Sequence, residues 1–416
     1  MSTADVAMRR CEELDRFSAH PTRLERVYLS PQHASVNRLT AGWMESAGMR
    51  TWQDAAGNQY GRLEGRKRGL PALLLGSHLD TVPDAGSYDG MLGVVMALAV
   101  AERLRSRMRE LPFALEVVGF SDEEGTRFGA ALLGSRAAAG TWDDDWWDLR
   151  DANGTTLHQA FLEFGLDPRR VGEAARRREE LVGYLEAHIE QGPYLEAADV
   201  SLGLVTTIAG ARRFRLTVIG EARHAGGTPY PRRKDALVGA SEIVLAIERL
   251  ARDAGCIATV GRLEVLPGAV NVIPGRADLS LDLRAEDDAR RDAVWVQILA
   301  EITAGCSARD LELRVVETHS APAMPCADWL QDAIREGIAV TGDTDPMALW
   351  SRAGHDGMAI GATTDIGMLF VRCFDGISHH PGEAVREIDV ARGLDALEAA
   401  VLSVARRVEA GVKAPA

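Results

Sequence analysis

Cysteines are few in this chain, and no two of them stand in a CxxC spacing. They are five in number and scattered, which argues against a disulfide framework and a structural zinc ribbon and favours a reducing compartment. Their positions are Cys11, Cys256, Cys306, Cys326 and Cys373.

Long apolar runs are also missing. The N-terminal stretch MSTADVAMRRCEELDRF lacks the apolar core of a secretory signal. No stretch approaches the roughly 20 uninterrupted apolar residues that a membrane-spanning helix needs. We therefore expect a soluble, cytoplasmic protein with no membrane partner.

Basic residues are fewer than acidic ones, and the formal net charge is −14. A nucleic-acid surface needs a concentrated basic face, so a nucleic-acid partner is not expected. Apolar residues make up 46% and charged residues 26%, which is ordinary globular composition and argues against extensive disorder. A chain of 416 residues exceeds one ordinary hydrophobic core, so two domains are expected.

The first half of the chain has the sequence pattern of an α/β fold. Apolar runs at Ala72–Gly76 and Phe113–Phe120 predict buried strands, and Gly90–Leu104 between them predicts a helix. Continuous apolar strands alternating with helices indicate a parallel sheet covered on both faces. A helical segment over about Met8–Gly48 and a strand pair turning at Gly57-Asn58 are expected before it. Further predictions are a strand at Tyr184–Gln191 and solvated charged segments at Trp142–Arg150 (a loop) and Arg169–Glu180 (a helix face).

The pattern of apolar and polar residues changes at about Gly210. Arg213–Gly220 alternates as a half-exposed antiparallel strand does, and two long amphipathic helices follow it. These features predict an inserted α+β domain, after which the α/β sequence pattern returns. We expect catalytic segments at 1–209 and 323–416 and the insert at 210–322. The elements expected from Gly210 onward are helices at Lys234–Ala251, Asp288–Gly305, Asp328–Val340 and Gly393–Ala410, and strands at Cys256–Pro267, Arg276–Arg284 and Gly367–Val371.

Polar residues stand where the predicted strands end. Buried carboxylates there are costly unless a cation compensates them, and strand ends of an open α/β sheet meet at one edge. Histidine with carboxylate suits zinc, and also manganese, cobalt or nickel. Singly, each has an ordinary explanation: a histidine can be a hydrogen-bonded core residue, and Asp89 can cap the following helix. Jointly they predict a buried divalent-metal site formed by His78, Asp80, Asp89, Glu123, Glu124, His188 and His379.

Several motifs carry a resemblance to a known family. GSHLDTV at 76–82, Asp89-Gly90, SDEEGTRF at 121–128, HIEQGP at 188–193 and SHHPGE at 378–383 resemble the co-catalytic metallopeptidase/amidase superfamily of aminoacylases and glutamate carboxypeptidases. HIEQGP, HAGGTP at 224–229, NVIPG at 271–275 and AGHDG at 353–357 resemble its branch of N-carbamoyl-amino-acid hydrolases, ureidopropionases and allantoate amidohydrolases.

The resemblance implies a mixed sheet with helices on both faces that carries a dimetal site, plus an inserted α+β lid and dimerisation domain. Each subunit of a homodimer would bind two divalent cations, zinc or manganese first, with cobalt or nickel as alternatives. Asp89 would bridge both cations, with Asp80 orienting His78 and Glu123 acting as the general base. The remaining ligands would be His78 and His188 for one cation, and Glu124 and His379 for the other.

The resemblance also implies substrate contacts. Gln191 would hydrogen-bond a ureido group, and His224 would stabilise the oxyanion of the tetrahedral intermediate. Arg284, assisted by Asn271, would bind a substrate carboxylate, although a surface ion pair is the alternative for Arg284. His355 lies in a family motif without an assigned role. Arg212 and Arg213 are either further anion contacts or ordinary surface charge.

The chain departs from the family pattern in places. HAGGTPY has Gly227 and Tyr230 where the branch usually reads HAGTTPM, and Arg372 stands in FVRCFDG instead of an FVPS-like stretch. His380, in SHHP instead of SHNP, competes with His379 for the ligand position, and the resemblance favours His379. These changes are expected near the substrate pocket, so they leave the exact substrate open.

The resulting hypothesis is hydrolysis of a terminal carbamoyl (ureido) group. The expected substrate is an N-carbamoyl-L-amino acid or allantoate, both small and carboxylate-bearing, with release of ammonia and carbon dioxide. An aminoacylase or peptidase on the same scaffold is the first alternative, against which His188 and Gln191 argue. A non-enzymatic metal-binding protein is the second, against which the intact Glu123 argues.

Overall fold

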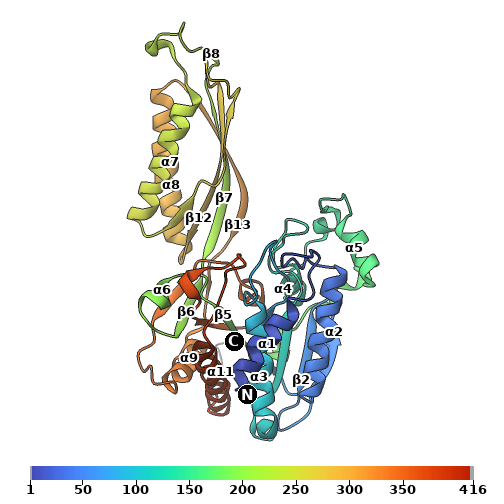
Figure 1. The fold of residues 1–416 in the computed structure, drawn as a ribbon. Helices are drawn as coiled ribbons and strands as arrows, with labels where there is room; N and C mark the ends of the chain where they lie inside the picture. Colours follow the sequence, from blue (N-terminus) through green and yellow to red (C-terminus); the bar gives the residue numbers. More distant parts are fainter. Residues whose placement is uncertain (1, 413–416) are drawn as a thin grey trace. The chain divides into compact units, whose positions relative to one another are not determined.

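The computed structural model, which describes residues 2–412, divides the chain into two compact units (Figure 1). Unit 1 combines the chain up to Thr206 with the chain from Pro325 onward, and unit 2 is Thr207–Met324. Unit 1 is an α/β unit with a mixed sheet, as the sequence predicts.

The sheet of unit 1 has nine strands in the order β1-β2-β4-β3-β5-β16-β6-β14, with β15 paired to β6. Its centre is parallel, because β3 pairs in parallel with β4 and β5, and β5 with β16. β2 and β6 join this centre antiparallel. The strands are β1 (Arg50–Gln53), β2 (Gln59–Leu63), β3 (Ala72–His78), β4 (Ala114–Phe120), β5 (Leu181–Ile189), β6 (Leu202–Ile208), β14 (Met324–Pro325), β15 (Ala348–Ser351) and β16 (Ile366–Val371).

Parallel pairing brings the carboxyl ends of these strands to one edge. His78, the last residue of β3, pairs with Phe120, the last residue of β4. His188 of β5 pairs with Phe370 of β16. Residues that directly follow β4 therefore begin beside His78.

Helices cover both faces of this sheet. On one face, a Cβ at Gly367 of β16 would lie 2.9 Å from Leu330 Cβ of α9, so that helix packs closely on the strand. Phe370 of the same strand faces the other way, with its ring 5.9 Å from that of His355, just before α10. Nearly all of α3 is buried against β3, β4 and β5. The α-helices of unit 1 are α1 (Thr3–Leu14), α2 (Pro31–Ser46), α3 (Met91–Leu104), α4 (Leu133–Ala138), α5 (Leu157–Phe164), α6 (Tyr194–Ala197), α9 (Asp328–Ala339), α10 (Gly357–Ile360) and α11 (Glu387–Glu409).

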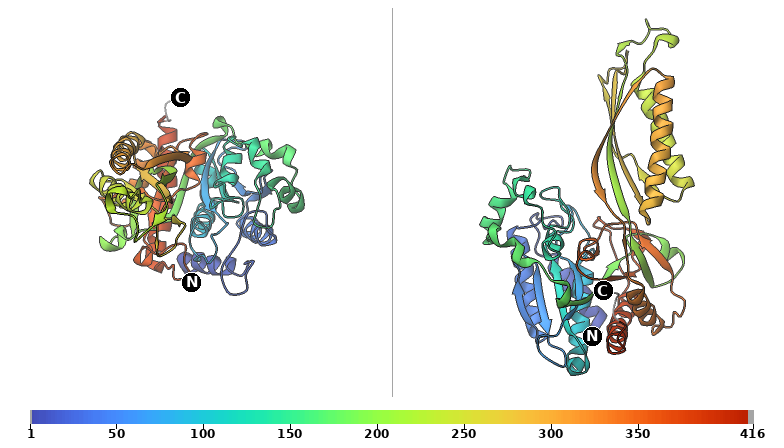
Figure 2. Two further views of the ribbon diagram at one scale, coloured as in Figure 1. Left: turned by 90° about the horizontal axis from the view of Figure 1, so that it is seen from above. Right: turned by 180° about the vertical axis from the view of Figure 1, so that it is seen from behind.

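Unit 2 is an antiparallel sheet with two long helices on one face (Figure 2). The strand order is β10-β12-β7-β13, with β9 paired to β12, and β8 and β11 form a separate ribbon. Leu216, Leu281 and Ile298 belong to its core between sheet and helices. Its elements are β7 (Gly210–Ile219), β8 (Arg223–His224), α7 (Ala236–Asp253), β9 (Ile257–Thr259), β10 (Leu263–Leu266), β11 (Val272–Ile273), β12 (Arg276–Ala285), α8 (Asp288–Ala308) and β13 (Glu312–Ala321).

Two expected elements are interrupted in the structure. The segment 256–267, expected as one strand, forms β9 and β10, which pair with β12 at different places and are separated by the irregular residues 260–262. The helical segment expected over Met8–Gly48 is split into α1 and α2 by an irregular stretch that contains Pro21 and ends at the N-cap Ser30.

Most charged side chains of the segments 142–150 and 169–180 are exposed, as predicted, but other side chains of both segments pack inward. Trp142 and Trp147 place their rings 5.8 and 4.9 Å from that of Phe161, inside a small apolar cluster. Arg176 donates a 2.7 Å hydrogen bond to the buried carboxylate of Glu116. Both segments contain short 3₁₀ helices in place of a plain loop and a helix. The 3₁₀ helices of the chain are η1 (Arg105–Glu110), η2 (Asp144–Asp148), η3 (Pro168–Ala174), η4 (Arg178–Glu180), η5 (Tyr230–Arg232) and η6 (Phe374–Gly376).

Within residues 2–412, no helix combines the length and the apolar character that crossing a membrane requires.

The buried carboxylate of Glu116 gives a stability prediction. It binds Arg62 through one oxygen and Arg176 through the other, both at 2.7 Å. Glu116→Gln is expected to lower the free energy of unfolding by about 3 kcal/mol, because two largely buried guanidinium groups lose their anion. Urea unfolding followed by tryptophan fluorescence measures this. The control Glu409→Gln, which breaks a half-exposed pair with Arg66, should cost less than about 1 kcal/mol. Equal losses in the two variants would contradict the prediction.

Candidate metal centre

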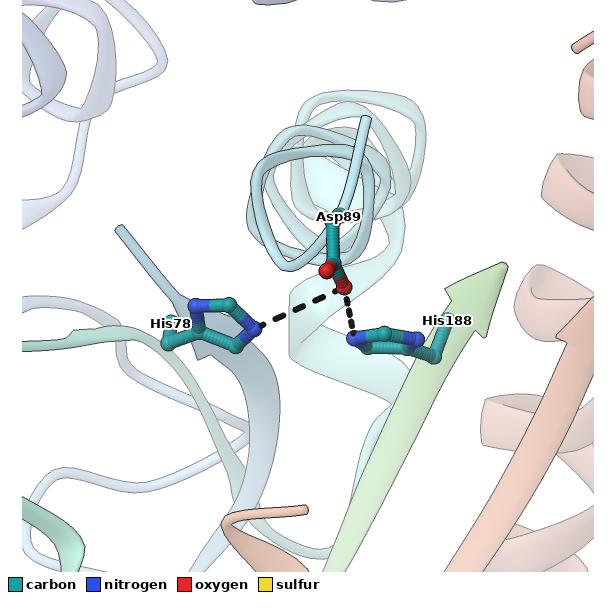
Figure 3. Close-up of side chains that lie close together, drawn as sticks. All are labelled: His78, Asp89 and His188. Carbon is teal, nitrogen blue, oxygen red and sulfur yellow. Dashed lines mark ion pairs between the residues drawn. The ribbon is translucent and has the colours of Figure 1, made fainter. Parts of the chain in front are cut away.

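Asp89 lies at the centre of the site, in the loop that leads into α3. Its side chain is almost fully buried. Asp89 Oδ1 is 3.1 Å from Nε2 of His188 on β5 and 3.9 Å from Nε2 of His78 at the end of β3 (Figure 3). Ligand atoms of these three residues lie within 4.8 Å of one another. Three segments far apart in the sequence thus meet at one carboxylate.

The second oxygen of Asp89 faces another group. Asp89 Oδ2 is 3.0 Å from Nε2 of His379, and this nitrogen is 3.5 Å from Oε1 of Glu124. Asp89, Glu124 and His379 also have ligand atoms within 4.8 Å of one another. The two groups share Asp89, so one carboxylate offers one oxygen to each.

Gly90 allows this close approach. Its φ is +74°, and a Cβ there would lie 2.4 Å from the ring of His78. Glycine is therefore required for α3 to begin directly against the histidine. Asp89 itself makes no side-chain cap bond to this helix, so the helix-cap alternative is wrong.

Hydrogen bonds fix which ring nitrogens face Asp89. Nδ1 of His78 is 3.0 Å from the carbonyl oxygen of Asp80, and Nδ1 of His188 is 2.9 Å from that of Ile189. A carbonyl oxygen only accepts, so each Nδ1 carries the hydrogen and a neutral ring directs its Nε2 lone pair at Asp89. His188 Nε2 and Asp89 Oδ1 are both buried without a hydrogen-bond partner. Lone pairs that face each other in this way fit a divalent cation, and imidazole with carboxylate suits zinc or manganese.

Neighbouring carboxylates at the site shift one another's pKa. Burial raises the pKa of Glu123 well above its usual range, and the nearby Glu124 carboxylate raises it further. Burial, reinforced by Asp89, raises the pKa of Glu124 to about 7. Burial alone would lower the pKa of His188, but the Asp89 carboxylate outweighs burial and raises it. These raised pKa values show that positive charge, whether of protons or of a cation, stabilises this cluster.

Asp80 holds both glutamates in position. Its Oδ1 accepts a 2.9 Å hydrogen bond from the N–H of Glu123, and its Oδ2 accepts a 3.1 Å bond from that of Glu124. The Asp80 carboxylate lies 3.4 Å from Nδ1 of His78, farther than the residue's own carbonyl oxygen. Asp80 therefore orients three residues of the site at once, partly through its backbone.

Gln191 lies inside this constellation. Its Nε2 donates to Asp89 Oδ2 and to Ser378 Oγ, both at 3.1 Å, and is 3.3 Å from Nε2 of His379. Gln191 and His379 both have φ of 54°, in the left-handed region that non-glycine residues seldom adopt. His380 is exposed, and its Nδ1 accepts a bond from the N–H of Gly382. His379, not His380, therefore joins the Asp89 group.

His355 packs behind His188. The two rings meet edge to face with centroids 4.4 Å apart, and His355 Nε2 is 2.7 Å from Ser351 Oγ. Burial, together with the charge of His188, holds the pKa of His355 well below its usual range. A neutral His355 thus braces the His188 ring. Glu186, His188 and His355 also lie close enough to form a third group of potential ligands.

Arg372 has a structural role that the sequence did not indicate. Its guanidinium donates two hydrogen bonds, of 2.8 and 3.0 Å, to the buried carboxylate of Asp389 in α11. A third bond, of 2.9 Å, goes to Asp199. The unusual FVRCFDG sequence therefore anchors α11 to the end of β16.

The substrate residues expected beyond Gly210 lie in unit 2. His224 is exposed on β8 and pairs with Val272 of β11, which brings Asn271 next to it; its Nδ1 accepts a bond from Gly227 N–H. Arg284 of β12 donates a 2.7 Å bond to Asp282 on its own strand. Arg212 pairs with Glu317 and Asp292, and Arg213 with Asp282.

Several buried polar residues of the site were not expected from the sequence. Asp122 and Asp356 are fully buried, and none of their carboxylate oxygens has a hydrogen-bond partner among the described residues. Burial raises the pKa of both. Their positions next to Glu123 and His355 in the sequence could have identified them as residues of the site. Ser378 and Glu383 lie within SHHPGE and contact Asp89 or its backbone.

Comparisons with known proteins agree with this geometry. Residues 74–403 match the model of peptidase family M20/M25/M40. A probable allantoate deiminase of Oryza sativa subsp. japonica is 38% identical over 425 residues, covering 94% of this chain and 86% of the relative. An N-carbamoyl-L-amino acid amidohydrolase of Geobacillus stearothermophilus is 37% identical over 399 residues, covering 95% and 97%. The crystal structure of an amidase of the hydantoinase/carbamoylase family from Burkholderia multivorans superposes with a TM-score of 0.89 at 31% identity, covering 97% and 98%.

The chain therefore belongs to peptidase family M20/M25/M40. Within it, the chain is an amidohydrolase, an enzyme that acts on carbon–nitrogen bonds other than peptide bonds. The non-enzymatic alternative is thereby set aside.

Cation binding should stabilise the fold through Asp89. Adding zinc or manganese to metal-stripped protein is expected to raise the melting temperature, since a ligand at about 100 times its Kd contributes about 2.7 kcal/mol. Asp89→Asn should lose most of this rise, because both groups share that carboxylate. Differential scanning fluorimetry with and without EDTA measures the effect. Asp395→Asn, at an exposed pair with Arg103, should keep the full rise. An equal rise in Asp89→Asn would refute a shared site.

Proposed function

We propose that this enzyme hydrolyses the terminal carbamoyl group of an N-carbamoyl-L-amino acid or of allantoate, releasing ammonia and carbon dioxide. The observation that carries the proposal is the position of Gln191, whose carboxamide contacts Asp89 and His379. The names of the relatives from Oryza sativa and Geobacillus stearothermophilus support the same class of substrate.

Gln191 supplies an argument for a ureido substrate. Its Nε2 is engaged by Asp89 and Ser378, while its Oε1 is buried without a partner. A free buried acceptor calls for an N–H donor. A terminal carbamoyl group carries an NH₂ on the carbonyl carbon under attack, whereas an acyl or peptide substrate has a carbon substituent there. Gln191 Oε1 therefore favours the ureido group.

The two Asp89 groups would hold the cations, zinc or manganese. His78 and His188 would ligate one, and Glu124 and His379 the other, with Asp89 shared. When bound, such cations supply Lewis acidity that polarises the ureido carbonyl and acidifies water. Asp89 Oδ1 and His188 Nε2, two buried lone-pair atoms without a hydrogen-bond partner, support this assignment.

Glu123 would act as the general base. Its side chain is half-buried, and desolvation raises its pKa, which suits a group that accepts a proton and later returns it. Glu123 would take a proton from the attacking water and deliver it to the departing nitrogen. Asp80 holds the Glu123 backbone through a 2.9 Å bond, so the base is fixed before substrate arrives.

The remaining roles concern unit 2. We assign it the part of a lid and homodimerisation domain, in which His224 would stabilise the oxyanion. Arg284 and Asn271 would bind the substrate carboxylate, and Arg284 would exchange its bond to Asp282 for a bidentate contact. The likeness of the whole chain to hydantoinase/carbamoylase amidases supports a common arrangement.

Replacing the base should separate chemistry from binding. Glu123→Gln is expected to lower kcat by about 1000-fold while KM and metal content stay near the wild-type values, because only proton transfer is lost. Steady-state ammonia release and elemental analysis measure the three quantities. Glu179→Gln, on an exposed 3₁₀ turn, is the control and should keep full activity. Undiminished turnover in Glu123→Gln would rule out this residue as the base.

A substrate panel tests the proposed specificity against the aminoacylase and peptidase alternative. Wild-type enzyme is expected to prefer N-carbamoyl-L-amino acids or allantoate over N-acetyl-amino acids and dipeptides by about 100-fold in kcat/KM. Gln191→Met should reduce this preference at least about 10-fold, since it removes the acceptor for the ureido N–H. Ammonia is followed for ureido substrates and free amine for the others. Faster cleavage of N-acetyl or peptide substrates would favour the alternative.

A further inference from the structure

We propose that Glu383 is a positioning residue for Asp89, and that through Ser378 it keeps both Asp89 oxygens available to cations. This inference rests on the proposed function, because it requires that the Asp89 groups bind cations. Glu383 touches none of the reacting groups itself. It acts on the backbone and on one neighbour of the shared ligand.

One oxygen of Glu383 holds the backbone of the Asp89 loop. Glu383 Oε1 accepts the N–H of Tyr88 at 2.7 Å and the N–H of Asp89 at 3.0 Å. Glu383 is 6% exposed, so water competes weakly for these bonds. Two successive amides directed at one buried carboxylate oxygen fix the orientation of the peptide from which the Asp89 side chain projects.

The other oxygen of Glu383 controls the proton of Ser378. The Ser378 hydroxyl is 2.9 Å from Glu383 Oε2 and 3.2 Å from Asp89 Oδ2, and it has only one hydrogen to donate. Donation to Glu383 leaves Asp89 Oδ2 without this bond. The same hydroxyl then accepts the N–H of Gln191, at 3.1 Å. Glu383 thereby preserves a lone pair of Asp89 that a cation can use.

The Asp89 loop is shaped around Glu383. A Cβ at Gly86 would lie 2.3 Å from Glu383 Cβ, so only glycine admits the glutamate at this point. Glu383 also follows His379 by four residues in the same segment. One side chain thus connects the segment that carries His379 to the loop that carries Asp89, and both residues belong to the second ligand group.

A purely structural clamp would behave differently from a positioning residue. Loss of a clamp lowers the stability of the cation-free protein and leaves cation affinity unchanged. Loss of a positioning residue weakens cation affinity, since groups that orient metal ligands typically contribute about 10- to 100-fold. Cation affinity and the melting temperature in EDTA are therefore the two readouts.

The experiment compares full-length wild type with Glu383→Gln, Ser378→Ala and a control. Zinc or manganese affinity is measured by calorimetric titration of metal-stripped protein, and bound metal by elemental analysis after dialysis. Glu383→Gln should lose about 10- to 100-fold in affinity, with a small change of melting temperature in EDTA. Ser378→Ala removes the hydroxyl whose hydrogen could reach Asp89 Oδ2, so it should fold normally and keep near-wild-type affinity. The matched control is Asp235→Asn, where a carboxylate in unit 2 also accepts two successive amides, those of Leu237 and Val238.

The outcomes distinguish this inference from the proposed function. Wild-type protein that binds no divalent cation would overturn both. Wild-type protein that binds two cations, together with unchanged affinity in Glu383→Gln, would overturn the positioning role alone. If Glu383→Gln proved too unstable to titrate, Ser378→Ala would decide: a large loss of affinity there would overturn the Ser378 step, since no hydroxyl is left to compete for Asp89 Oδ2, and near-wild-type affinity would support it.

Discussion

The burial of the Asp89 carboxylate between imidazole rings is the constraint on which the site depends. The rings of His78 and His188 each donate the Nδ1 hydrogen to a backbone carbonyl oxygen. Their other nitrogens therefore face Asp89. Negative charge and lone pairs are thus gathered in a place that water does not reach. Positive charge, as protons or as cations, offsets the cost of burying this carboxylate. The fold of unit 1 therefore creates a place where a cation would be stabilised.

Strands position some of the residues around Asp89, and loops position the others. Parallel pairing of β3, β4 and β5 brings His78, His188 and the Glu123–Glu124 pair to one edge, as in other α/β sheets. Loops bring the rest. Asp80 fixes the backbone after β4, and Glu383 fixes the backbone before α3. The strands therefore set the coarse position of the ligands, and buried carboxylate-to-amide bonds set the fine position.

Features encoded by neighbouring residues could be predicted from the sequence, whereas contacts between residues far apart in the chain could not. The buried strands and α3 were predictable because apolar runs of fixed length encode them locally, and the residues that end those runs were visible for the same reason. The Glu116–Arg176 pair was not, because a charged stretch gives no sign of a partner sixty positions away. Glu383 was visible only as part of a motif, since its partners are backbone amides. Whether the unit 2 residues His224, Asn271 and Arg284 act on the same substrate stays a prediction.

The order of residues along the chain has a consequence for synthesis. Unit 2 interrupts unit 1 between Thr206 and Pro325, and both His379 and Glu383 come after the interruption. A ribosome therefore finishes the whole of unit 2 while unit 1 still lacks α9, α11 and one of the three residues of the second ligand group. During that interval the carboxylates of Asp89 and Glu124 have no His379 beside them. The nascent polypeptide thus passes through a stage at which four of the five proposed metal ligands have been synthesised and the fifth, His379, has not.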